Sequence, residues 1–228
     1  MPKLGMEPIR RDQIRKAASK MIAKRGFNKT TLADVAKAAK VSTGMVNHYY
    51  KNKTVLMVDT LIYASEWFQS SMRTAMARAP TPLDKLSQIF RVGLLDQKGM
   101  GYIGSKIWGW ALAEGMHSKE LAAVIKERRD LFEQMIMELI YDIDPTSRAR
   151  KTEVRELVAE LDAYVNGLAL HNVTGAQNLN PRSVERSLMM LVMSRLCLDE
   201  SVVNARLDGP ETATPKSSSF GVRQAQAS

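Results

Sequence analysis

The chain of 228 residues has little cysteine and no long apolar run. Cys197 is its single cysteine, which excludes an internal disulfide and any metal site built from several thiolates, and fits a reducing compartment. No segment reaches the roughly 18 apolar residues that a membrane span requires, and no apolar stretch follows the basic N-terminus as in a secretory signal. We therefore expect a cytoplasmic protein without membrane contact.

Acidic residues are scarce in the first quarter of the chain. Residues 1–53 hold 13 Lys and Arg but only 3 Asp and Glu, a net charge of +10, whereas residues 54–228 carry a net charge of −1. A merely solvated face would mix acids with the bases. A basic region confined to one end suits a polyanion, because neutralised phosphates release condensed counterions. The first quarter therefore predicts a segment that binds nucleic acid.

The sequence also lacks a recognisable catalytic or metal-binding constellation. The three histidines, His48, His117 and His171, belong to no metal-ligand or nucleophile motif, and there is no phosphate-binding loop. Isolated carboxylates are typical of solvated helix faces. We predict no enzymatic activity and no cofactor.

No convincing alternation of apolar and polar residues predicts a strand, whereas apolar residues recur every three or four positions almost throughout, as at Leu121, Val124 and Ile125. The fold class is therefore expected to be all-α, with about nine helices delimited by caps, glycines and prolines. The composition from residue 206 onward predicts a disordered tail over 206–228. The expected helices are residues 9–25, one after Thr31, one from Ser42 to about Tyr50, one from residue 52 or 53 towards 79, and later ones including about 154–175 and 181–198.

Residues 31–53, TLADVAKAAKVSTGMVNHYYKNK, have the pattern of two short helices that cross steeply at a tight turn, a helix-turn-helix. Lys40 occupies the turn position where glycine is usual, so we expect a left-handed backbone there at a cost of about 1 kcal/mol. Any helical hairpin can imitate this pattern, but the basic surroundings favour a DNA-reading motif. The buried seam between the two helices is expected at Val35, Ala36, Val41 and Val46.

The first 60 residues or so resemble the TetR family of one-component transcriptional repressors. The opening segment MPKLGMEPIRR resembles the start of the BetI subgroup, repressors of the choline-to-glycine-betaine pathway, as do Lys106, Ile107 and Trp108 with Met116 and His117 downstream. The resemblance implies a DNA-binding domain over residues 1–53 and a helical ligand-binding and dimerisation domain over 54–205. Family-typical residue types occur at Phe27, Thr30, Thr31, Val35, Ala36, Val41, Ser42, Gly44, Val46, Tyr49, Tyr50 and Lys53.

The resemblance also implies which residues contact DNA. Thr30 or Thr31 would bind a phosphate at a helix N-terminus, although Thr31 can equally serve as a cap. Asn47 replaces a tyrosine that many relatives use for a phosphate contact; it could read adenine or make a shorter polar contact. Lys3, Arg10 and Arg11 would form an arm that follows a groove. The expected DNA-contacting residues are Thr30, Thr31, Ser42, Thr43, Gly44, Asn47, His48, Tyr49 and Lys53.

A homodimer on a palindromic operator follows from the same resemblance. Residues 154–175 and 181–198 would pair with their two-fold mates as a four-helix bundle, and the apolar run 188–193 is broader than one buried stripe requires. The two recognition helices would lie about 34 Å apart, one turn of the duplex. A small molecule bound in the second domain would change that separation by swinging the helix that begins near residue 53.

The effector implied by the subgroup is choline or a related quaternary ammonium compound, which aromatic faces and a carboxylate would hold. Trp108 and Trp110 are two positions apart, so at most one of them should face any single cavity. Each tryptophan could instead fill the core, and the ligand could be a different small molecule. For the protein as a whole, the alternative is a non-specific architectural DNA binder, and the near-neutral charge of residues 54–228 argues against it. The candidate ligand residues are Trp67, Trp108, Trp110, Glu114, Tyr164 and Asn166.

Overall fold

The computed structural model describes residues 6–95, 100–175 and 180–199, which fold into nine α-helices and one short 3-10 helix, with no strand in these ranges. The all-α prediction is confirmed. None of the helices described there is long and apolar enough to cross a membrane. The elements are α1 (Met6–Arg25), α2 (Leu32–Ala39), α3 (Thr43–Tyr49), α4 (Lys53–Met76), α5 (Pro82–Leu95), α6 (Met100–Gly115), α7 (Lys119–Ile143), η1 (Pro145–Arg150), α8 (Lys151–Thr174) and α9 (Pro181–Leu196).

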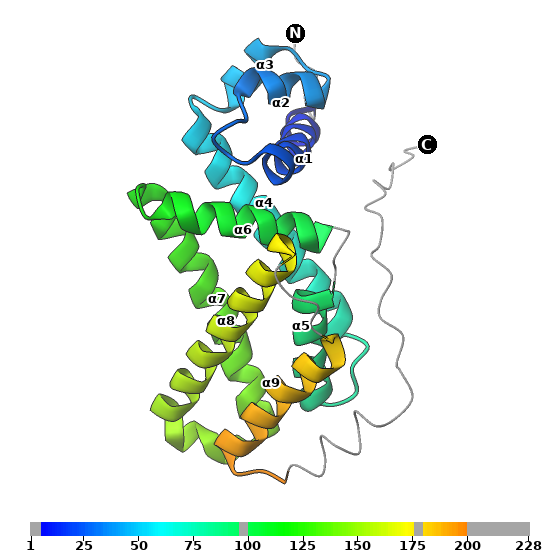
Figure 1. Cartoon of the computed structure of the whole chain (residues 1–228), viewed down its shortest axis with the longest axis vertical. Coiled ribbons are helices and arrows are strands. Elements are labelled where there is room, and N and C mark those ends of the chain that lie inside the picture. The colour runs from blue at the N-terminus through cyan, green and yellow to red at the C-terminus, as the bar shows by residue number, and fades with distance from the viewer. Residues whose placement is uncertain (1–5, 96–99, 176–179, 200–228) are drawn as a thin grey trace.

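The helices α1, α2 and α3 form a head at one end of the molecule (Figure 1). The long helix α4 leads from this head into a body built from α5, α7, α8 and α9, and α6 crosses between the two parts. Because α6 packs against α1, α4, α7 and α8, it lies where the head and the body meet. Helices α4 and α6 are therefore the two elements through which a change in the body can reach the head.

The helix boundaries in the head follow from caps encoded locally. The hydroxyl of Thr31 accepts from the backbone N–H of Asp34, whose carboxylate accepts in return from the backbone N–H of Thr31, so α2 begins with a capping box. The Thr31 hydroxyl also donates to the Asp34 carboxylate at 2.8 Å, and this bond, together with the one from the Thr31 N–H, lowers the pKa of Asp34. Ser42 caps α3 through a bond from Met45 N–H, and Asn52 caps α4.

Other helix ends differ from the sequence prediction by a few residues. Helix α1 begins at Met6, three residues earlier than expected, and α8 begins at Lys151. Helix α4 stops at Met76. The last backbone N–H groups before Pro80 donate to carbonyls three residues back instead of four, so the α-helical hydrogen-bond pattern does not continue. Helix α9 ends at Leu196, where Cys197 adopts the left-handed conformation (φ 57°) and closes the last turn.

Lys40 adopts the left-handed backbone that the sequence predicted, with φ 55° and ψ 42°. It ends α2, and the following N–H of Val41 donates to the carbonyl of Ala36 at 3.0 Å. This bond pattern closes a helix C-terminus without glycine. The turn therefore sets α3 across α2, with Val35 and Val46 completely buried between them.

The buried core of the head continues into the body. One cluster joins residues of α1–α4 to Ile107 and Ala111 of α6 and to Leu121 and Ile125 of α7. The expected boundary at residue 53 therefore falls inside a shared core. A second cluster fills the body between α4, α5, α7, α8 and α9.

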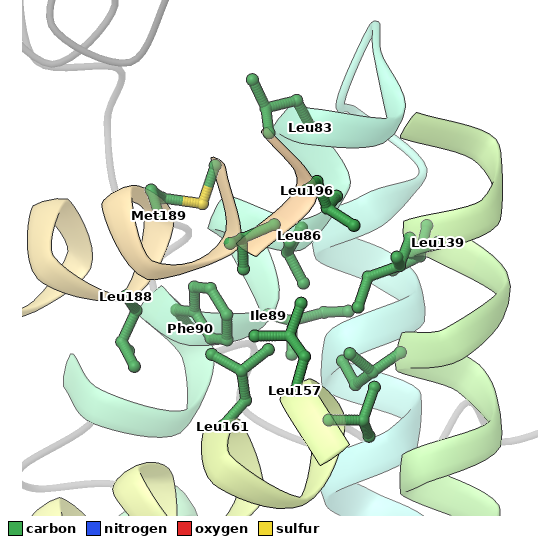
Figure 2. Packing of buried hydrophobic residues seen from close by; sticks show 14 of the residues in the cluster. Leu83, Leu86, Ile89, Phe90, Leu139, Leu157, Leu161, Leu188, Met189 and Leu196 are labelled. Atoms are coloured by element: carbon green, nitrogen blue, oxygen red, sulfur yellow. The ribbon is translucent and has the colours of Figure 1, made fainter. Parts of the chain in front are cut away.

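The second cluster also accounts for most of the apolar run 188–193 (Figure 2). Leu188 projects from α9 toward Phe90 of α5 and Leu161 of α8, and Met189 and Val192 are equally inaccessible to solvent. The breadth of the run is thus largely explained within one chain. The half-buried Met190 and Leu191 form its outer edge.

Candidate functional site

The head presents one polar helix face to solvent. Val46, in the seam with α2, is buried, so the opposite side of α3 faces solvent. The exposed residues there are Thr43, Gly44, Asn47 and His48, together with the cap Ser42. Tyr49 is half-buried with its ring edge-on to His48, at 5.3 Å between ring centroids. Six of the nine residues expected to contact DNA therefore lie on or beside one accessible face.

Thr30 does not lie on this face. Its side chain is only 2% exposed, and its hydroxyl donates to the carbonyl of Gly26 at 2.8 Å. Its backbone N–H donates to Phe27 O, so neither donor is free for a phosphate. The expectation for Thr30 is corrected: this residue holds the turn between α1 and α2, while the exposed Thr31 caps α2.

Lys53 is oriented by contacts on two sides. Its ammonium group donates to the carbonyl of Asn28 at 2.9 Å and lies 4.5 Å from the centroid of the Phe27 ring. These contacts place the cation at the N-terminus of α4, beside the α1–α2 turn. The exposed cations Lys37, Lys40 and Lys51 add positive charge to the same head.

Arg10 and Arg11 belong to helix α1 rather than to an extended arm, and Lys3 lies outside the described residues. The Arg11 guanidinium donates to Asp59 of α4 at 3.2 Å, and this carboxylate raises the pKa of Arg11. The hydroxyl of Tyr50 donates to the same carboxylate at 2.6 Å. Burial then raises the pKa of Tyr50 further above its ordinary value. This network, in which Tyr50 and Asp59 are buried and Arg11 is half-exposed, ties the head to α4, and the expectation of a groove-following arm is corrected for these two arginines.

A cavity of about 130 Å³ lies in the body between α4, α6, α7 and α8. Its walls are mainly apolar and aromatic, with Trp67 and Phe68 from α4, Trp108 from α6 and Phe132 from α7. An apolar cavity with a few convergent polar groups is the usual form of a small-molecule site. The charged groups here are Arg128, Arg129 and Asp162, and the neutral polar side chains are Ser65, Gln69, Ser105 and Asn166.

The polar groups of the cavity are connected by hydrogen bonds. Trp108 Nε1 donates to Asn166 Oδ1 at 2.8 Å, and Asn166 Nδ2 donates to Asp162 Oδ1 at 2.9 Å. Arg129 pairs with Asp162 Oδ2 at 3.1 Å. Burial raises the pKa of Asp162, and the nearby arginine opposes this effect. Trp67, Trp108 and Asn166 are thus brought together in one cavity.

The other three candidate ligand residues lie elsewhere. Two positions along an α-helix correspond to about 200° of rotation, so Trp110 points away from Trp108 and packs against Gly26 in the head. Glu114 accepts a hydrogen bond from Asn28 at 3.0 Å. Tyr164 is 59% exposed on α8. Trp110, Glu114 and Tyr164 are therefore not part of the cavity, and the first two connect α6 to the head.

The residues of the cavity that were not predicted from the sequence include its three charged ones: Arg128, Arg129 and Asp162. The pattern did contain a signal for the first. Position 128 continues the three- and four-residue spacing of the apolar positions 121, 124 and 125, so that an arginine occupies the inward face of α7. A cation on such a stripe needs a partner inside the molecule, and that requirement indicates a site.

A basic helix-turn-helix head on a helical body with an internal cavity is typical of ligand-responsive transcriptional regulators. Residues 14–60 match the model for bacterial regulatory proteins of the tetR family, and residues 82–196 match the C-terminal model of BetI-type transcriptional repressors. The chain belongs to the TetR family, and its C-terminal region is of the BetI type. Members of this family are transcriptional regulators, which confirms the expectation that the protein is not an enzyme.

Relatives and solved structures agree with this assignment. The chain is 30% identical to the transcriptional regulator BetI of Paraburkholderia xenovorans over 82% of this chain and 93% of that protein. It is 27% identical to BetI of Brucella anthropi over 80% and 91% of the two chains.

Two solved structures illustrate the shared fold. A transcriptional regulator from Pseudomonas aeruginosa PAO1 has a TM-score of 0.69 at 17% identity and covers 90% of this chain and 96% of its own. A transcriptional regulator from Saccharomonospora viridis in complex with choline has a TM-score of 0.68 at 16% identity, covering 80% and 94%.

Proposed function

We propose that this protein is a homodimeric repressor that binds a palindromic operator through α3 and leaves it when a small molecule occupies the body cavity. The observation that carries the proposal is the exposed polar face of α3 on a segment of net charge +10. The remainder of the chain carries a net charge of −1 and contains the cavity. Such a distribution suits one DNA-binding end and one sensing end, and a regulator of this kind would act in the cytoplasm.

The proposed DNA contacts divide into two kinds. Thr43, Gly44 and Asn47 lie on the exposed face of α3 and would meet base edges in the major groove, where an asparagine amide matches adenine. Ser42 and His48 would meet the backbone, with Tyr49 beside them. Thr31 and Lys53 would bind phosphates at the N-termini of α2 and α4.

The proposed dimer interface lies on the outer faces of α8 and α9. Tyr164 and Leu170 are large side chains that are 59% and 38% exposed on α8, and Met190 and Leu191 remain accessible at the edge of α9. Apolar side chains of this size at a surface favour association with a second copy. Two copies joined there would present their heads to successive major grooves about 34 Å apart.

Release from the operator would use the helices that join the cavity to the head. Trp67 and Phe68 of α4 line the cavity, and the same helix carries Asp59, which anchors Arg11 and Tyr50 in the head. A ligand that separates α4 from α6 would shift both supports of the head. The two recognition helices would then no longer match the spacing of the grooves.

The ligand class implied by the subgroup is a quaternary ammonium compound, choline among them. The faces of Trp67, Trp108 and Phe132 support this proposal, because aromatic rings attract a cation that cannot donate a hydrogen bond. The size is of the same order: a cavity of about 150 Å³ holds benzene, so about 130 Å³ suits a compact ligand of about six non-hydrogen atoms. A regulator of a different pathway, with another small ligand, is the second candidate.

Band-shift titration on the promoter of the protein's own gene tests the repressor proposal. We expect a complex of one or more dimers that resists competition by random duplex, and an affinity that falls steeply as salt rises. Adding small molecules of the proposed class should release the promoter. Equal competition by random DNA would reject the repressor and favour an architectural DNA-binding protein.

A further inference from the structure

The guanidinium group of Arg128 is only partly satisfied by the residues around it. Its side chain is only 16% exposed and lines the body cavity. The guanidinium Nη2 pairs with Glu127, whose side chain is 59% exposed at the surface of α7. The Nε atom is buried and makes no hydrogen bond to any residue that the structure describes.

The carboxylate that also lines the cavity is already occupied. Asp162 Oδ2 pairs with Arg129 at 3.1 Å, and Asp162 Oδ1 accepts from Asn166 at 2.9 Å. The Asp162 side chain is 8% exposed, whereas that of Arg129 is 45% exposed, so the carboxylate of this pair is the buried partner. A ligand cation entering the cavity would therefore compete with Arg129 for its counter-ion.

The charge balance of the cavity wall therefore favours an anion. The charged residues that line the cavity are two arginines and one carboxylate. Arg129 pairs with Asp162 and, at 3.6 Å, with Glu133, whereas Glu127 compensates Arg128 only from the solvent side, where ion pairs contribute little. A buried donor without an acceptor costs free energy, and more so when the group is charged. An acceptor supplied by the ligand would remove that cost.

We propose that the effector carries a carboxylate, which Arg128 binds, on a small body that packs against Trp67 and Phe132. The proposal rests on the cavity being the effector site of the proposed function. A planar carboxylate suits the edge of a guanidinium group, and such a charge-assisted bond is stronger than a neutral one. Choline has only a hydroxyl to offer Arg128 and brings a second positive charge to the arginines.

Four probes of nearly equal size separate the two charges of the ligand. Choline has a quaternary nitrogen and a hydroxyl, and 3,3-dimethylbutanol is its uncharged isostere. Glycine betaine has the same nitrogen with a carboxylate, and 3,3-dimethylbutanoate is the isostere that keeps only the carboxylate. Calorimetric titration of the full-length protein should show both carboxylates binding at least about tenfold more tightly than the matching alcohols, the factor that one charge-assisted hydrogen bond provides.

Substitutions test whether Arg128 causes the tighter binding of carboxylates than of alcohols. Arg128→Met keeps the aliphatic volume but removes the donor, so it should reduce the preference for carboxylates to less than about twofold. Arg155→Met, at an exposed position of α8 outside the cavity, should keep the full preference. Arg128→Lys retains the charge and should keep part of the preference for carboxylates. This variant replaces Arg128→Met in the test if a circular dichroism melt shows that Arg128→Met is unfolded.

The outcomes separate this inference from the proposed function. Tighter binding of choline than of glycine betaine, an undiminished preference in folded Arg128→Met, or no binding of any probe by protein that still shifts its promoter, would each overturn the carboxylate proposal alone. Carboxylate binding that depends on Arg128 supports it even when the promoter stays bound, and that result would instead reject ligand-induced release. Between the two carboxylates, tighter binding of glycine betaine would show that the aromatic walls also recognise the quaternary nitrogen.

Discussion

At the scale of single residues, two of the candidate DNA-contacting residues in the head have opposite environments. The Thr30 hydroxyl is buried and satisfies the carbonyl of Gly26, whereas the Asn47 side chain is exposed on α3 without a hydrogen bond to the described protein. A buried hydrogen bond contributes to stability, and an exposed amide is free to meet a base edge. The two residues should therefore respond to substitution in different assays.

Thr30→Val keeps the side-chain shape but removes the donor to Gly26, so we expect a loss of about 1 kcal/mol in the free energy of unfolding. Asn47→Ala should leave stability within about 0.5 kcal/mol of wild type, because the site is exposed. Denaturant melts and band shifts on a panel of operator variants measure both properties. Altered base preference in Thr30→Val, or unaltered preference in Asn47→Ala, would contradict these roles.

At the scale of elements, α6 carries side chains to both of its neighbours. Trp108 faces the cavity and donates to Asn166 of α8, while Trp110, on the opposite side, packs against Gly26 at the end of α1. Glu114 adds a hydrogen bond to Asn28 in the same turn. One helix therefore touches the cavity and the head, independently of α4.

Gly26→Ala tests how firmly α6 contacts the head. A Cβ there would lie 2.7 Å from the Trp110 ring, and the residue has φ +80°. Gly175 has φ +69° with nothing within 4 Å of an added Cβ, so Gly175→Ala measures backbone strain alone, about 1–2 kcal/mol. We expect Gly26→Ala to lose about 1 kcal/mol more than this control in the free energy of unfolding.

Truncating the Trp110 side chain should remove the additional loss in the free energy of unfolding that Gly26→Ala shows over Gly175→Ala. In a Trp110→Ala background, Gly26→Ala should cost no more than Gly175→Ala, as a double-mutant cycle of denaturant melts would show. Equal losses for the two glycine variants in the wild-type background would mean that the ring moves aside freely. The contact could not then transmit a change from α6 to the head.

At the scale of the whole molecule, the outer faces of α8 and α9 would determine in the proposed dimer whether two heads can act together. Leu188 does not test this interface, because it is 2% exposed within one chain and a charge there would disrupt the body core. Tyr164 is a better position, since its side chain is 59% exposed and lies outside the cavity. A charge there can oppose association without entering the core.

Tyr164→Glu should convert the dimer to a folded monomer at micromolar concentration and lower operator affinity, because the paired half-sites can no longer be bound together. Leu131→Glu, at a 44% exposed position of α7, is the matched control and should remain dimeric. Sedimentation velocity and band shifts measure both properties. A dimeric Tyr164→Glu protein would place the interface on another face.

The local pattern was enough to predict the helix-turn-helix, because its determinants lie within a few residues of one another. The left-handed Lys40, the caps at Thr31 and Ser42 and the buried Val35 depend on short-range hydrogen bonds and helical periodicity. The asymmetry of charge is likewise a property of composition. None of these features requires knowledge of a distant partner.

The direction of a side chain on a long helix depends instead on what packs against it. Sequence spacing predicted that Trp108 and Trp110 diverge, but only the packing of α6 between α1 and α8 decided which of them faces the cavity. The same holds for Asp162, which meets Arg129 across two helices, and for the buried Arg128. The amino-acid sequence thus determined a basic, helical head with a helix-turn-helix, whereas the tertiary structure decided the charge of the body cavity, because that charge arises from contacts between residues distant in the chain.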